Sequence, residues 1–105
     1  MSTTPPTEGH VALLTIVAES ILEPRLLGEL RACGASGWTT TAARGEGSRN
    51  RRVGDLDGGN VRIEALVSPE VAARVMERLA DDYFTHYAIV AWIADVAVYR
   101  SERYT

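Results

Sequence analysis

The two halves of the chain repeat one pattern, and this repeat limits the fold more than any other feature of the sequence. In each half, a run of β-forming residues is followed by a stretch of helical spacing and then by a second β-forming run. Two strand–helix–strand units in series form one antiparallel sheet with both helices on one face. The sequence therefore predicts an α+β fold, the ferredoxin-like βαββαβ arrangement with a four-stranded sheet.

The first half supplies the strand His10–Ala18, a helix and the strand Trp38–Ala43. The first run is short and apolar, as in a buried strand, and the second is rich in β-branched threonine. Ser20 with Glu23 three positions later is typical of a capping box, and Gly34 is typical of a helix C-cap. The apolar positions between these signals keep helical spacing: Leu22, Leu26, Leu27, Leu30 and Cys33.

The second half begins with residues 61–68, in which apolar and polar residues alternate as in a half-buried strand. Ser68 and Pro69 predict the N-cap and first position of a helix that ends near Asp82. The helix repeats an apolar residue every fourth position, at Val71, Val75 and Leu79. The longest strand is predicted over Tyr87–Tyr99, with one face formed by Val90, Trp92, Ala94, Val96 and Val98.

One face of this sheet carries no helix, and its predicted composition is mixed. We expect three charged residues there among three apolar ones: Arg62, Glu64 and Asp95 among Ile89, Ala91 and Ile93. Arg62 and Glu64 are expected to form an ion pair. Such a face suits packing against other subunits better than contact with water, and a domain of this size buries only roughly 65% of its unfolded surface by itself. The sequence therefore predicts an oligomer.

The composition is that of one soluble globular domain. The sequence has 105 residues, 46% apolar and 24% charged, and no 18-residue apolar run. Residues 1–10 are expected to form a flexible tail and residues 11–105 the domain, in the cytoplasm. Cys33 is the only cysteine and is expected to be a small buried side chain, and no metal site is expected at His10 or His86.

The connection from Arg44 to Asn60 concentrates arginine and glycine. It holds five of the nine glycines of the chain. Within it, residues 44–52 carry four arginines and one acidic residue, Glu46, and so have a net charge of +3. The rest of the chain has seven arginines and thirteen acidic residues, and so has a net charge of −6. The glycines of Gly45–Ser48 allow backbone N–H groups to converge on an anion, and arginine forks bind phosphate or carboxylate oxygens. Connections this long are usually functional or disordered. We expect an anion site, phosphate first, with a solvated charged loop as the alternative.

Three stretches of the chain resemble the PII signalling superfamily, and within it the PII-like proteins linked to bicarbonate uptake and carboxysomes. They are GASGWTTTAARGEGSRNRR, NVRIEALVS and DDYFTHYAIVAWIADVAVY, and the resemblance runs from about Val11 to Tyr99. It implies a homotrimer of ferredoxin-like subunits that binds adenine nucleotides in the clefts between neighbours. It also implies that residues 44–60, approximately, are the T-loop, which reports ligand state to a partner.

The function implied by this resemblance is regulatory and not enzymatic. The implied ligands are ADP, AMP, ATP or cyclic AMP, with bicarbonate as a candidate second ligand and no cofactor. A bicarbonate transporter or a carboxysome component is the candidate protein target, and no nucleic acid is expected. The sequence does not rank the nucleotides.

The resemblance also implies the residues of a nucleotide site, none of them catalytic or metal-binding. Its phosphate-facing loop base corresponds to Gly45, Gly47, Ser48, Arg49 and Arg52. Thr39, Ala43 and Arg44 come just before it, and Arg62 is implied to lie inside the intersubunit cleft. The backbone of Tyr87, Ala88 and Ile89 is implied to approach the adenine from the neighbouring subunit.

The chain departs from nitrogen-sensing PII proteins in two ways. Residues 44–60 contain no tyrosine that could accept a uridylyl group, and DDYFTHYAI stands in place of their Gly- and Lys-rich B-loop. Nitrogen sensing is therefore not expected. Two alternatives stay open at this point: a small adenine-nucleotide hydrolase that uses the arginine-rich cleft, and a trimeric interaction protein without a small ligand. An RNA-recognition domain is disfavoured, because NVRIEALV carries no aromatic residue and the net charge is −3.

Overall fold

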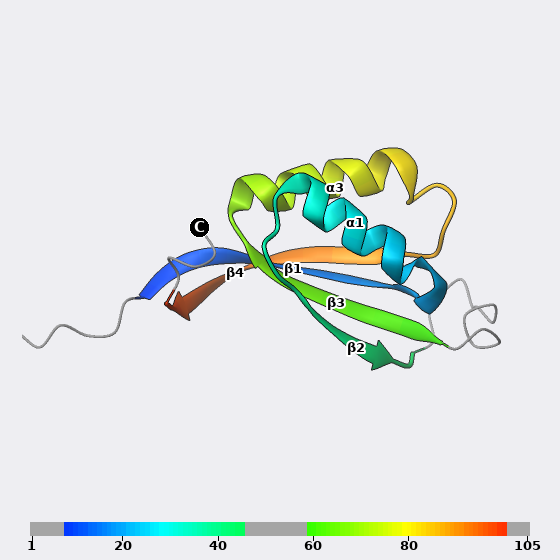
Figure 1. Cartoon of the computed structure of the whole chain (residues 1–105), viewed down its shortest axis with the longest axis horizontal. Coiled ribbons are helices and arrows are strands. Elements are labelled where there is room, and N and C mark those ends of the chain that lie inside the picture. The colour runs from blue at the N-terminus through cyan, green and yellow to red at the C-terminus, as the bar shows by residue number, and fades with distance from the viewer. Residues whose placement is uncertain (1–7, 46–58, 101–105) are drawn as a thin grey trace, which may run out of the picture.

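The computed structural model describes residues 8–45 and 59–100, which form a four-stranded antiparallel sheet with two helices on one face (Figure 1). The strand order β2-β3-β1-β4 is that of the ferredoxin-like fold, so the predicted fold class is confirmed. The elements are β1 (Glu8–Glu19), the 3₁₀ turn η1 (Ser20–Leu22), α1 (Glu23–Cys33), β2 (Thr39–Ala43), β3 (Asn60–Val67), α3 (Pro69–Asp82) and β4 (Val90–Tyr99).

The helix ends follow the sequence signals at three of four places. The Ser68 hydroxyl accepts a hydrogen bond from the Val71 N–H at 3.2 Å and caps α3, and Gly34 ends α1 with a left-handed φ of 110°. The predicted capping box at Ser20 is wrong. Ser20 opens the 3₁₀ turn, where its own N–H donates to the Gly59 carbonyl at 2.9 Å, and α1 starts only at Glu23. That bond ties the end of β1 to the start of β3.

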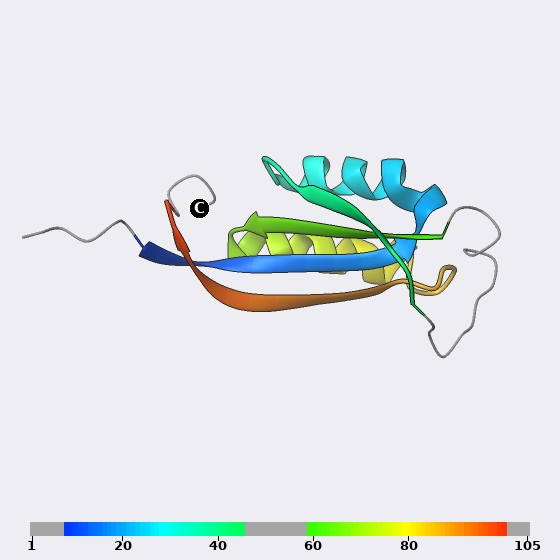
Figure 2. The same cartoon turned by 90° about the horizontal axis from the view of Figure 1, so that it is seen from below.

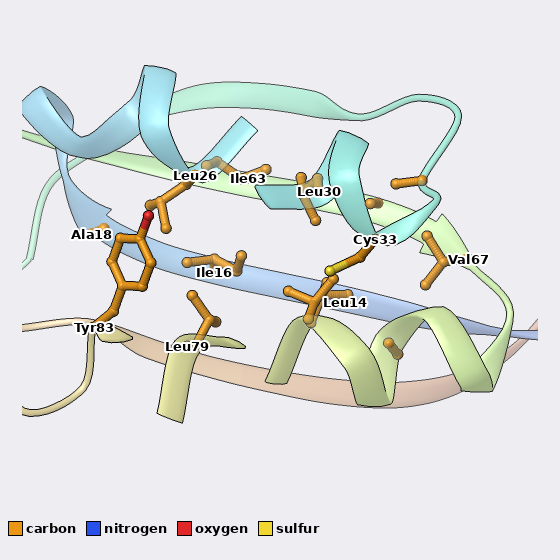
Figure 3. Close-up of a cluster of buried hydrophobic side chains, with 14 of the residues drawn as sticks. Leu14, Ile16, Ala18, Leu26, Leu30, Cys33, Ile63, Val67, Leu79 and Tyr83 are labelled. Carbon is orange, nitrogen blue, oxygen red and sulfur yellow. The ribbon is translucent and has the colours of Figure 1, made fainter. Parts of the chain in front are cut away.

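The core lies between the sheet and the helices (Figure 3). Alternate residues of β1 and β3 point toward the helices, and each helix packs one stripe of apolar side chains against them. Leu26, Leu30, Val75 and Leu79 are fully buried, and Cys33 lies among them as a small buried side chain, as predicted. The helical spacing read from the sequence therefore identified the buried stripe of both helices.

The pairing register decides which side chains reach the sheet face without helices, here called the bare face. Arg62 pairs with Val17, which pairs in turn with Val90, so all three share this face. In Figure 2 the strands lie in front of α3, which shows that no helix covers this side. The strand residues of the bare face include Val11, Leu13, Thr15, Val17, Thr39, Thr41, Ala43, Arg62, Glu64, Leu66, Val90, Trp92, Ala94, Val96 and Val98.

The predicted composition of the bare face is right for two residues of six. Arg62 and Glu64 lie on it, but Asp95 pairs with the core residue Ala12 and therefore lies on the helix side. Ile89, Ala91 and Ile93 also lie on the helix side, where Ile89 and Ala91 pack against the core. One residue of register moves a side chain to the opposite face, and the sequence contains no signal that fixes β4 against β1 to that accuracy.

The strand bounds also shift at both ends of the chain. β1 starts at Glu8, so residues 8–10 belong to the sheet and not to a tail. β4 starts at Val90, three residues later than predicted, because residues 83–89 form a separate hydrogen-bonded turn. This turn is part of the site described next.

Candidate functional site

The stems of the long connection meet where β2 ends and β3 begins. Ala43 pairs with Asn60, and Gly59 just before it has a φ of 84°, a conformation that favours glycine. Arg44 and Gly45 lie exposed just beyond β2. The other predicted phosphate residues, Gly47, Ser48, Arg49 and Arg52, lie outside the described residues.

Three predicted site residues lie on the bare face at the β2 side of the sheet: Thr39, Ala43 and Arg62. Arg62 Nη2 lies 3.3 Å from Glu64 Oε2, which confirms the predicted ion pair, and the guanidinium lies 5.6 Å from the centre of the Trp92 ring. The Arg62 side chain is still 43% exposed. The pair is therefore a local contact that leaves part of the guanidinium accessible from the bare face.

The segment Tyr83–Ile89 is a compact turn between α3 and β4. The N–H groups of His86 and Tyr87 both bond to the Tyr83 carbonyl, at 3.0 and 2.9 Å, and the Ile89 N–H bonds to the Tyr87 carbonyl at 3.0 Å. Ala88 lies at the exposed middle of this last turn. Neither its N–H nor its carbonyl bonds to any residue within the ranges 8–45 and 59–100. The turn therefore presents one free peptide donor and one free acceptor.

The end of β2 and the turn before β4 lie at the same end of the molecule but at different edges of the sheet (Figure 1). β2, which carries Thr39 and Ala43, is one edge strand, and β4, which follows Ile89, is the other. Three strand spacings separate these edges, about 14 Å. The described residues of one subunit therefore hold the two groups on opposite edges of the sheet.

A second group of residues at this end was missed by the sequence analysis. Arg25 Nη1 donates a 2.9 Å hydrogen bond to the Tyr87 hydroxyl, and Tyr83 donates one of 2.9 Å to Glu29 Oε2. The bond to Tyr87 is the main cause that raises the pKa of Arg25, and burial raises the pKa of Tyr83. One signal was available: Arg25 lies in the first turn of a helix, where the helix dipole disfavours a cation unless it has a specific partner.

The other ionisable groups of the described residues form only exposed pairs or small contacts. His10 Nδ1 lies 3.4 Å from Asp95 Oδ1, and both side chains are largely exposed. Across residues 8–45 and 59–100, no three His, Cys, Asp or Glu side chains are grouped so that they could hold a metal ion. Within the same ranges, the helices are too short or too polar to cross a membrane.

Comparisons with known proteins identify the family. The model of the nitrogen regulatory protein P-II family matches residues 11–103. The solved structure of a protein from Thermus thermophilus, described as a PII-like signalling protein, is 47% identical to this chain in sequence. The match covers 93% of this chain and 98% of the Thermus chain, with a TM-score of 0.81.

Two structures of CPII from Thiomonas intermedia share the fold at lower identity. CPII bound to ADP, AMP and acetate is 21% identical, with a TM-score of 0.81, and covers 93% of this chain and 97% of its own. CPII bound to ADP and bicarbonate is 20% identical, with a TM-score of 0.82, and covers 96% and 100%. The family match and the Thermus relative both span nearly the whole domain. The chain therefore belongs to the nitrogen regulatory protein P-II family and is a PII-like signalling protein.

Proposed function

We propose that this protein is a trimeric regulator that binds an adenine nucleotide between neighbouring subunits and reports it through residues 44–60, the T-loop. Bicarbonate is the proposed second ligand. The proposed setting is the regulation of inorganic carbon in the cytoplasm, with a bicarbonate transporter or a carboxysome component as the protein target.

The observation that carries this proposal is the position of the two residue groups at one end but on opposite edges of the sheet. In a ring of copies, the β2 edge of each subunit faces the β4 edge of the next. Head-to-tail contacts of this kind form a closed ring when the rotation between neighbours divides a full turn evenly. Each contact then unites one loop base with the Tyr87–Ile89 segment of a neighbour. The number of sites equals the number of subunits.

The bare face supports association of subunits. Trp92 is 40% exposed there and Val90 53%, both unusually open for large apolar side chains. A second copy packed on this face would remove the exposed apolar surface of Trp92 and Val90 from water.

The ligand class follows from the chemistry of the two groups. Glycines that let N–H groups converge, together with planar arginine forks, suit the charged oxygens of a phosphate chain. The free N–H and carbonyl of Ala88 suit the donor and acceptor edge of adenine. The CPII structures contain ADP with AMP or bicarbonate, which gives these ligands priority.

Isothermal titration calorimetry of the whole chain tests this proposal. The ligands are AMP, ADP, ATP and cyclic AMP, each with and without bicarbonate, with GDP as the control for the base. We expect at least one adenine nucleotide to bind with one site per chain and GDP to bind more weakly. Absence of binding by all four adenine nucleotides would contradict the proposal and favour an interaction protein without a small ligand. Release of phosphate during the titration would favour the hydrolase.

A further inference from the structure

Arg25 joins the start of α1 to the turn that precedes β4. Its guanidinium carbon lies 5.1 Å from the centre of the Tyr83 ring and 5.6 Å from the centre of the Tyr87 ring. It also donates the 2.9 Å hydrogen bond to the Tyr87 hydroxyl. One side chain therefore contacts two aromatic residues of the same turn, by cation–π contact with both and by a hydrogen bond with one.

The first of these aromatic residues is fixed independently of Arg25. Tyr83 is 2% exposed, and in Figure 3 its ring points from the end of α3 toward α1, beside Leu26. Its hydroxyl donates to Glu29 Oε2, while Arg78 Nη2 lies 2.6 Å from the other oxygen, Oε1. Tyr83 is therefore held in place by contacts that do not involve Arg25, and it anchors the start of the turn.

Tyr87 has fewer restraints. Its ring is half-buried and tilted against Tyr83 at a centroid distance of 5.9 Å. Within the described residues, its hydroxyl has only the hydrogen bond from Arg25. Because the Tyr87 carbonyl accepts the Ile89 N–H, the position of Tyr87 sets the orientation of the Ala88 peptide between them. Arg25 therefore acts on Ala88 through Tyr87.

Helix stability does not account for an arginine at this place. Arg25 lies in the first turn of α1, at the positive end of the helix dipole, and its side chain reaches across to the turn instead of along the helix. We propose that Arg25 is a positioning residue of the nucleotide site, which holds Tyr87 and thereby aims the free peptide groups of Ala88 at the base. This assignment rests on the proposed function.

Loss of Arg25 should therefore weaken recognition of the base without weakening recognition of the phosphates. Ala43, where β2 leads into the proposed phosphate residues, lies in the opposite edge strand from β4, which follows the turn of Tyr87, so loss of Arg25 should not disturb it within a subunit. ADP binding should then weaken, whereas binding of inorganic pyrophosphate, which has the same phosphate pair without a base, should not. A residue that only stabilised the fold would change both ligands alike.

The test measures the dissociation constants of ADP and pyrophosphate for the whole chain by calorimetry. Arg25→Ala should weaken ADP binding about tenfold, the scale of one lost hydrogen bond to a charged group, and change pyrophosphate binding by less than about twofold. Arg25→Lys, which keeps a donor and a charge, should recover part of the loss. Tyr87→Phe should weaken ADP binding similarly, and the double variant should be no weaker than either single one, because both remove the same bond.

Arg74→Ala is the matched control. Arg74 also joins the two helical segments, since its Nε and Nη2 donate to the Cys33 carbonyl at 3.3 and 3.2 Å, but it does so at the other end of α1. This variant should bind ADP like the parent protein.

The outcomes separate this assignment from the proposed function. If the parent binds ADP and Arg25→Ala binds it equally well, or loses ADP and pyrophosphate to the same degree, the assignment is wrong and the proposed function stands. The assignment is also wrong if Arg74→Ala and Arg25→Ala lose ADP binding alike. A parent protein that binds no adenine nucleotide overturns the proposed function, and the assignment with it.

Discussion

At the residue scale, some arginines have partners in the fold and others are proposed for a ligand, and Arg62 belongs to both groups. Arg25, Arg62, Arg74 and Arg78 each contact a tyrosine, a carboxylate or a carbonyl of the described residues. The sequence pattern and the resemblance to PII-like proteins assign Arg49 and Arg52 to the phosphates of the proposed ligand.

Arg49→Ala should weaken adenine-nucleotide binding by about 1.5 to 3 kcal/mol, the scale of a lost hydrogen bond to a charged group. Arg49→Lys should recover only part of this, since an ammonium is a point charge and does not reproduce the planar fork. The neighbouring Arg51→Ala is the control, because it removes the same charge from the same loop. Calorimetry with ADP decides: equal losses for Arg49→Ala and Arg51→Ala would indicate general electrostatic attraction instead of a specific contact.

At the element scale, the two helices depend on different end signals. Ser68 caps α3 through its hydroxyl, whereas α1 begins after a 3₁₀ turn and has no side-chain hydrogen bond at its N-cap, Leu22. The start of α1 is instead held by the Ser20–Gly59 backbone bond and by burial of Leu22. A long-range backbone bond of this kind leaves no local pattern in the sequence, so the capping-box prediction failed at α1, whereas the N-cap prediction succeeded at α3.

Ser68→Ala should lower the free energy of unfolding by about 1 kcal/mol, because it leaves the Val71 N–H without its acceptor. Urea unfolding followed by circular dichroism measures the change. Ser36→Ala, at an exposed position between α1 and β2, is the control and should change stability by less than about 0.5 kcal/mol. Equal effects of the two substitutions would show that the cap contributes nothing specific.

The link between α1 and the end of α3 should weaken at alkaline pH. Burial, followed by the hydrogen bond to Glu29, raises the pKa of Tyr83, so the folded state holds the phenol proton more tightly than the unfolded chain does. This contribution to stability is complete below the unfolded pKa of about 10 and is lost as the pH rises through the folded pKa.

Urea unfolding at several pH values up to about 11 tests this contribution. The free energy of unfolding of the parent should fall more steeply above a pH of about 10 than that of Tyr83→Phe, which has no phenol proton to lose. Tyr99→Phe, at a position that is 56% exposed, should keep the steep dependence of the parent. Parallel pH profiles for the parent and Tyr83→Phe would contradict the raised pKa.

At the scale of the whole molecule, the sequence predicted well which side chains of each element are buried, and predicted less well how the strands pair with one another. Alternation in residues 61–68 and the apolar stripe of each helix follow from burial, which is a property of single elements, and both were confirmed. The face of Asp95 and the start of β4 depend on how β4 pairs with β1, and pairing between distant segments leaves little trace in either one. The candidate site residues come from the resemblance and stay predictions, whereas the placement of their strands at two edges of the sheet follows from the strand order.

Light scattering of the purified chain should give about three times the 11.4 kDa chain mass if the proposed trimer forms. Trp92→Arg places a second positive charge beside Arg62 on the bare face and should give a smaller particle, because burying that charge costs more than the interface gains. Ala73→Glu, at an exposed position of α3, should leave the mass unchanged. A parent protein that is monomeric at micromolar concentration would contradict the trimer.

Sharing of each ligand site by two subunits is tested most directly by mixing two defective variants. One variant carries Arg49→Ala and Arg52→Ala in the loop; the other carries Ala88→Trp, which blocks the exposed turn. Neither should bind ADP alone. After unfolding and refolding as an equal mixture, about a quarter of the subunit contacts should join an intact loop to an intact turn, so calorimetry should recover about 0.25 sites per chain. If the site lies within one subunit, every chain carries a lesion and the refolded mixture will bind no ADP.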